Sequence, residues 1–163
     1  MMNKKTFKYT IAACLFTLLS ILPSVAAACT ISEEAQVQFP FNITELSNSD
    51  RLSIANSVIE AKKWPDVEIQ AVVISGAYIK EKDVEKLKNE RAENAKYYLQ
   101  QLGIDAKNIL IDKKTFTDEM VAKKPDGTID VHQMIVELTP ICKGSCAWMC
   151  GDSRVIPRSK TIN

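Results

Sequence analysis

The sequence predicts an α/β (α+β) two-layer sandwich, in which helices pack on one small mixed sheet. Strand-like apolar segments alternate with segments of helical periodicity, in the order strand, helix, strand, helix, strand, loop, strand. The segment from Val67 to Ser75 becomes continuously apolar, which is typical of a central strand that is covered on both faces. The chain of 163 residues is long enough for one such domain with additional segments at its ends.

The first half of the chain supplies one strand and one helix. The strand is predicted from Val37 to Phe41, and it is expected at a sheet edge because Pro40 cannot donate a ladder hydrogen bond. Ser47 and Asp50 fit the acidic variant of a capping box, which predicts that a helix begins here. The helix is expected to stop near Trp64, since a proline follows that residue.

The second half repeats this alternation. We expect the central strand to end at Gly76, and a long helix to run from about Asp83 to Leu102 with Gly103 as its terminating residue. A short strand is predicted at 108–111 and a last strand at 131–139. Alternation in the last strand places four side chains on one face: His132, Met134, Val136 and Leu138.

The two ends of the chain differ from its body. Residues 1–28 combine three lysines, an apolar run from Ile11 to Leu22 and small residues before Cys29, in the order of a secretory signal peptide. The apolar run is too short for a transmembrane helix. We therefore expect a signal peptide at 1–28, a folded domain at 29–140 and a cysteine-containing basic tail at 141–163, in a secreted protein.

The cysteines link the number of disulfides to whether the protein carries a lipid anchor. Four remain after cleavage, namely Cys29, Cys142, Cys146 and Cys150, and an even number in an oxidising compartment predicts two disulfides with three possible pairings. Cys29 would also be the first mature residue, which makes it a candidate for a lipid anchor to the outer membrane. A lipid on Cys29 would leave an odd number of thiols. A bridge from Cys29 to the tail would require the start of the first strand to lie near the end of the last.

Charge and motifs exclude several classes of function. Residues 1–28 hold three lysines and no acidic residue, so removing them takes the formal charge from +1 to −2. The tail is basic and the body acidic, which does not predict a nucleic-acid partner. The single histidine, the absence of a glycine-rich phosphate loop and the three-residue gaps between the tail cysteines predict neither an enzyme, nor a metal site, nor a cofactor.

Arg91 is the residue that bears most on function. On a helical wheel with Leu87 at zero, Arg91 lies at about 40°, inside the apolar stripe of its helix. A guanidinium in that position must have its donors paired. It either pairs with a carboxylate of the same chain or lies under a pocket and binds the carboxylate of a ligand.

The motifs around Arg91 resemble those of OmpA-like domains, the periplasmic modules that attach outer membranes to peptidoglycan. The matching segments are Leu87, Arg91-Ala92, Tyr98-Leu99, Leu102-Gly103-Ile104, Phe39-Pro40-Phe41-Asn42, Val72 to Gly76, and Val136-Glu137-Leu138. Together they cover about 105 residues of the chain in the family's order. The resemblance implies that Arg91 binds a diaminopimelate carboxylate of the peptidoglycan stem.

The chain departs from the family at the second half of the ligand clamp. The family's aspartate, which holds the ligand's ammonium, is replaced by Ile79, and we expect Asp83 or Glu81 to take its place if peptidoglycan is bound. Two hypotheses follow for a non-catalytic envelope protein. Either it binds peptidoglycan through Arg91 and Asp83, or it has lost this binding and is a disulfide-stapled component that contacts an envelope protein partner.

Overall fold

The computed structural model describes residues 29–126 and 129–160. The helices and strands are β1 (Cys29–Thr30), β2 (Glu33–Val37), α2 (Asn48–Ala61), β3 (Glu68–Tyr78), α3 (Val84–Gln101), β4 (Ile109–Phe116), β5 (Ala122–Lys123), β6 (Ile129–Asp130), β7 (Met134–Ile141) and β8 (Ser159–Lys160). Two short 3-10 helices, Ala106–Asn108 and Ala147–Gly151, complete the set. The predicted signal peptide lies outside the described residues.

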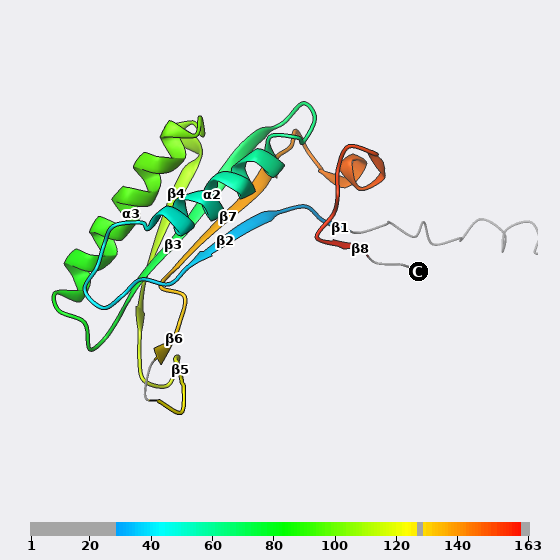
Figure 1. Cartoon of the computed structure of the whole chain (residues 1–163). Coiled ribbons are helices and arrows are strands. Elements are labelled where there is room, and N and C mark those ends of the chain that lie inside the picture. Colours follow the sequence, from blue (N-terminus) through cyan, green and yellow to red (C-terminus); the bar gives the residue numbers. More distant parts are fainter. Residues whose placement is uncertain (1–28, 127–128, 161–163) are drawn as a thin grey trace, which may run out of the picture.

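The main sheet has four strands in the order β2-β7-β3-β4. β3 pairs with β4 in parallel, whereas β7 is antiparallel to both of its neighbours. α2 packs on β2 and β7, α3 packs on β3 and β4, and both helices lie on the same face of the sheet (Figure 1). This arrangement confirms the predicted fold class, an α+β two-layer structure with a mixed sheet.

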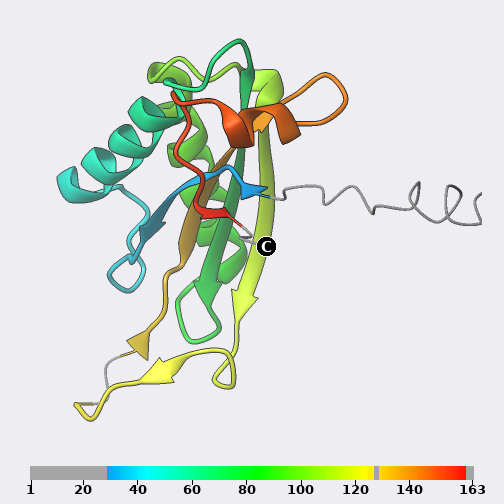
Figure 2. The same ribbon diagram turned by 90° about the vertical axis from the view of Figure 1, so that its right-hand side faces the viewer.

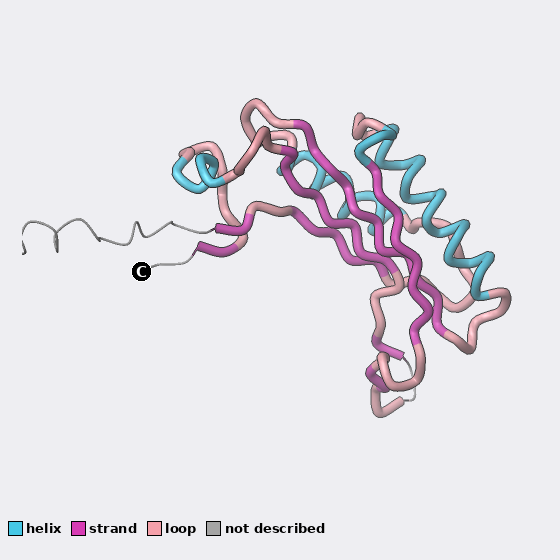
Figure 3. Tube along the Cα trace, turned by 180° about the vertical axis from the view of Figure 1, so that it is seen from behind, coloured by secondary structure: helices cyan, strands magenta, loops and turns pink. Residues whose placement is uncertain are grey.

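The hydrophobic core lies between the sheet and its helices. α2 begins with the predicted capping box, in which the Ser47 side chain accepts from the Asp50 amide and the Asp50 carboxylate accepts from the Ser47 amide. The sheet buries alternate side chains under the helices, among them Ala71, Val73, Val136 and Leu138. Val72 and Ile74 are only partly buried, so the prediction that the central strand is covered on both faces is wrong. Figure 3 shows the sheet from behind.

Several predicted strand boundaries are also wrong. The first main strand is Glu33–Val37 rather than 37–41, because the Phe39 amide and carbonyl bond to the Gln133 side chain instead of a neighbouring strand. β3 continues past Gly76 to Tyr78, with the Phe116 ring so close that a Cβ on Gly76 would lie 2.2 Å from it. His132 is exposed and precedes β7 instead of belonging to it.

A protruding arm follows β4, and the sequence did not predict it. β4 is eight residues long rather than four, and β5 and β6 then form a small antiparallel pair outside the main sheet (Figure 2). Tyr78, Val121 and Val131 form a second small core that holds the base of the arm. The end of the sheet that carries the arm is therefore built from parts distant in the sequence.

The tail returns to the opposite end of the domain. One disulfide joins Cys29 to Cys150 and a second joins Cys142 to Cys146, as expected for two bridges. β8 pairs with β1, and Met149 and Val155 are buried in the main core. The proximity of the first strand's start to the end of the last strand, which a bridge from Cys29 to the tail requires, is confirmed. In the described part of the chain, no helix is both long and apolar enough to cross a membrane.

Candidate functional site

Arg91 lies in the middle of α3 and faces the sheet. Its side chain is 0% exposed, which confirms that the arginine belongs to the buried stripe of its helix. Leu87 and Ala95, one turn away on either side, are buried on the same face. The helix therefore places a permanent positive charge inside the core, where it requires a partner.

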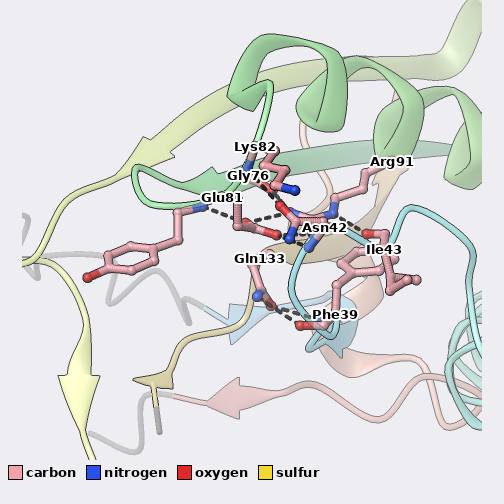
Figure 4. Close-up of polar contacts among 9 residues, drawn as sticks. Phe39, Asn42, Ile43, Gly76, Glu81, Lys82, Arg91 and Gln133 are labelled. Atoms are coloured by element: carbon pink, nitrogen blue, oxygen red, sulfur yellow. Dashed lines mark hydrogen bonds and ion pairs between the residues drawn. The ribbon is translucent and has the colours of Figure 1, made fainter. Parts of the chain in front are cut away.

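The guanidinium of Arg91 is bound entirely by groups of the same chain (Figure 4). Nη2 donates to Glu81 Oε1 at 2.5 Å, and Nη1 donates to Glu81 Oε2 at 3.1 Å. Nη1 also donates to the Gly76 carbonyl and Nε to the Ile43 carbonyl, each at 2.9 Å. The guanidinium carbon, Cζ, lies over the Phe39 ring at 4.6 Å from its centre. This geometry matches the first interpretation of Arg91, an internal ion pair.

Glu81 is held as firmly as its partner. The tight turn from Tyr78 to Glu81 brings the carboxylate back to the Tyr78 amide, which donates to Oε2 at 2.7 Å. The Asn42 amide donates to Oε1 at 2.9 Å. Burial raises the pKa of this carboxyl, but the hydrogen bonds from Arg91 and from the Tyr78 and Asn42 amides outweigh it, so the pKa lies below its usual 4.5.

We expect the lowered pKa of Glu81 to make the protein less stable in acid. Because the unfolded chain takes up the proton first, the pair's contribution is complete above pH 4.5 and is lost as pH falls through the folded pKa. Urea unfolding at pH 7 should give a higher free energy of unfolding for the wild type than for Glu81→Gln. This difference between the two proteins should become smaller as the pH falls below 4.5. Asp118 and Asp152 also have lowered pKa values, but both proteins contain them, so their contributions to the pH dependence cancel in the difference. A gap independent of pH would contradict this.

The structure does not bring Arg91 and Asp83 together. Asp83 is exposed at the start of α3, in the left-handed region with φ 50°, whereas the acid on Arg91 is Glu81. Ile79, at the position of the family's aspartate, is half-exposed. From the sequence, Glu81 was a candidate to bind the ammonium group of a ligand, but in the structure its carboxylate contacts Arg91. The role of Asn42 was missed, since a backbone amide leaves no signal in the sequence.

The surface next to Arg91 is acidic. Asn94 donates to the Thr44 carbonyl at 2.9 Å, and this contact fixes the 43–44 segment over α3. An open pocket at this contact is lined by Thr44, Glu45, Asn89, Glu90, Glu93 and Asn94. Its three carboxylates face solvent; Glu90 pairs with Lys86 at 3.7 Å, and the lining that the structure describes holds no cation of its own. A ligand carboxylate is repelled there rather than attracted.

A larger pocket opens on the other side of the ion pair, between the segment after β2 and the arm. Its volume is about 610 Å³, and we call it the aromatic pocket. It is lined by Gln38, Phe39, Pro40, Phe41, Tyr78, Lys80, Lys123, Asp126, Ile129, Val131 and Gln133. Pockets of this size with apolar walls and a few polar groups are typical of ligand sites.

The polar rim of this pocket is organised around Asp118. Its carboxylate accepts from the Tyr78 hydroxyl, from Lys80 at 2.9 Å and from Lys123 at 3.2 Å. These bonds, led by that of the Tyr78 hydroxyl, hold the pKa of Asp118 far below its usual value. Two ammonium groups therefore share one carboxylate at the rim.

The four cysteines predicted as disulfide candidates are all paired. The Cys29–Cys150 bridge spans 121 residues of sequence, whereas the Cys142–Cys146 bridge spans four. The first bridge uses the Cys29 sulfur, which is the atom that a thioether-linked lipid would need. The two modifications exclude each other, and the structure favours the bridge. Two disulfides fit a protein of an oxidising compartment such as the cell envelope.

No protein-family model matches the chain, and no curated protein matches it. Among solved structures it is similar to the OmpA-like domain of FopA1 from Francisella tularensis subsp. tularensis SCHU S4, with a TM-score of 0.43 and 14% identity over 70% of this chain and 79% of that chain. A likeness at this level carries no argument about the site, and the resemblance to the OmpA-like family stays a prediction.

Proposed function

We propose that this protein is a non-catalytic, disulfide-stapled module of the bacterial periplasm that contacts a protein partner and does not bind peptidoglycan through Arg91. The observation that carries the proposal is the complete enclosure of the Arg91 guanidinium by Glu81 and by the Gly76 and Ile43 carbonyls. A ligand carboxylate would have to displace Glu81, which would then lie buried without its cation, at a cost of roughly 3–5 kcal/mol.

The end of the domain that carries the arm offers a surface for a protein partner. Phe41, Ile79 and Met120 are 50%, 52% and 51% exposed, respectively. Phe41 lines the aromatic pocket, and Ile79 directly follows Tyr78 of the same lining. Half-exposed large apolar side chains of this kind are typical of interaction surfaces. The Cys29–Cys150 bridge supports a location in the periplasm without a lipid anchor, since the Cys29 sulfur is used by the bridge.

Sedimentation with purified sacculi tests the first half of the proposal. We expect the oxidised wild-type protein to stay in the supernatant, in the presence and absence of free diaminopimelic acid. Wild-type protein that sediments and is released by diaminopimelic acid would overturn the proposal. The wild type is the informative sample because a variant of the buried Arg91 is expected to be strongly destabilised, and a loss of binding in it would not report on the site alone.

Site-specific photo-crosslinking in the producing cell tests the second half. The photo-crosslinker benzoylphenylalanine replaces Phe41, Ile79 or Met120. Leu52 on α2 is 62% exposed and serves as the matched control position. We expect a discrete protein adduct from the arm end and none from Leu52. No protein adduct from any of the three positions, or adducts to glycan alone, would contradict the proposal.

A further inference from the structure

Phe39 and Tyr78 contact the Arg91–Glu81 pair directly, and Phe41 packs on Tyr78, so all three aromatic walls of the aromatic pocket are connected to the pair. Figure 4 shows Phe39 beside the pair. Phe39 stacks on the Arg91 guanidinium at 4.6 Å. The Tyr78 amide donates to Glu81, and the Phe41 ring meets the Tyr78 ring edge-on at 6.0 Å. The buried ion pair therefore has a second consequence beyond stability, because it positions the surfaces that a ligand would touch.

Two further contacts fix the walls on the main chain. Gln133 accepts from the Phe39 amide at 2.9 Å and donates to the Phe39 carbonyl at 3.0 Å, as a neighbouring strand would. The backbone amide of Asn42 donates a hydrogen bond to Glu81, and the side-chain oxygen of Asn42 accepts one from the Lys82 backbone amide at 2.6 Å. These two bonds anchor the turn that carries Phe41. Walls held in this way are preorganised, so that little ordering is needed when a ligand binds.

The rim holds two lysines and two aspartates, and Lys80 is the cation that lies next to the Tyr78 wall. Lys80 and Lys123 share the single carboxylate of Asp118, whose oxygens also accept from the Tyr78 hydroxyl. The Lys80 ammonium lies 5.8 Å from the centre of the Tyr78 ring, beside the apolar interior. Asp126 lines the pocket as well and makes interactions of its own, so we place the anion with Lys80, next to the Tyr78 wall.

We propose that the aromatic pocket binds the carboxyl terminus of a protein partner whose last residue is large and apolar. The side chain of that residue fills the space between Phe39, Phe41 and Tyr78, and its terminal carboxylate bonds to Lys80. A terminal residue joins an apolar group and a carboxylate at one carbon atom, which matches an apolar cavity with a cation at its edge. This inference rests on the proposed function and names the chemistry of the partner.

A matched pair of probes tests the chemistry of this site. N-acetyl-L-phenylalanine carries the terminal carboxylate, and N-acetyl-L-phenylalaninamide differs only in lacking that charge. In NMR titrations of the oxidised wild-type protein, we expect saturable shifts of the Phe39, Phe41, Tyr78 and Lys80 amides with both probes. The carboxylate probe should bind about fivefold more tightly, which is the effect of one exposed charge-assisted contact.

Variants separate the charge from the walls. Lys80→Gln should abolish the preference for the carboxylate and leave the affinity for the amide probe unchanged. Lys63→Gln, at another exposed lysine that is paired with a glutamate, should leave the preference intact. Equal affinities of the two probes for the wild type, or no saturable shift at the pocket residues up to the solubility limit of the probes, would overturn the site.

The outcomes distinguish this inference from the proposed function. If position 41 gives a protein adduct in cells but the pocket amides do not shift with either probe, the proposed binding site for a carboxyl terminus is wrong and the proposed function stands. Probe binding without any protein adduct would overturn the proposed function, and with it the protein origin of the ligand. A carboxylate preference that persists in Lys80→Gln would show that the anion is bound elsewhere, and would also overturn the site.

Discussion

Arg91→Met should lower the free energy of unfolding by about 3–5 kcal/mol, because it leaves the Glu81 carboxylate buried without its cation. The same change removes the donors of the Gly76 and Ile43 carbonyls and the cation under the Phe39 ring. A loss of this size is a large fraction of the stability of an ordinary domain, about 5–15 kcal/mol. Urea unfolding followed by circular dichroism measures it.

Two further variants show whether the loss comes from the ion pair. The double variant Arg91→Met/Glu81→Gln should recover part of the stability, because it removes the uncompensated buried charge, and the single glutamine oxygen still accepts from one of the two backbone amides, Tyr78 or Asn42. Lys63→Met breaks the exposed pair with Glu60 and should cost less than about 1 kcal/mol. A loss below about 1 kcal/mol for Arg91→Met would mean that the guanidinium is not enclosed, and would return Arg91 to the ligand-binding hypothesis.

The second large effect is expected at the long-range disulfide. Cys29→Ser/Cys150→Ser removes a bridge that spans 121 residues, and in the chain-entropy model it should cost about 5 kcal/mol. Cys142→Ser/Cys146→Ser removes a bridge that spans four residues and should cost about 2 kcal/mol. The gap has a second cause, because the long bridge also holds Met149 and Val155 against the core.

Urea unfolding of the two double variants under oxidising conditions measures the difference. Intact mass with and without reductant should show two disulfides in the wild type and one in each double variant. Equal losses, or a larger loss for the short bridge, would contradict the long-range role of Cys29–Cys150. A lipid on Cys29 would appear in the same mass measurement and would exclude that bridge.

The elements with clear local periodicity could be predicted from the sequence. α3 was expected from about Asp83 to Leu102 and spans Val84–Gln101, and the capping box of α2 formed as predicted. The order of strands and helices followed from the same alternation. The ends of the strands were less well predicted, since a strand ends where its neighbour ends, and the neighbour is distant in the sequence.

The candidate site divides in the same way. The position of Arg91 on the buried stripe was evident from helical spacing alone, because every third or fourth residue of a helix returns to one face. Its partner was not evident. Glu81 and Asp83 lie in the same short segment, and only the turn at Tyr78 directs one carboxylate inward and leaves the other in solvent.

The sequence by itself therefore determined the fold class, the burial of one arginine and a cysteine count that allows two disulfides, since each depends on local pattern or on residue count. The tertiary structure decided which acid meets Arg91, which cysteines pair, and that an aromatic pocket stands beside the ion pair. The acid and the pocket depend on segments such as 38–42, 78–81, 117–123 and 129–133, and the long bridge depends on Cys29 and Cys150; all of these are distant in sequence and meet only in the folded chain. Contact between distant segments is set by packing of the whole domain, and no local pattern carries that information.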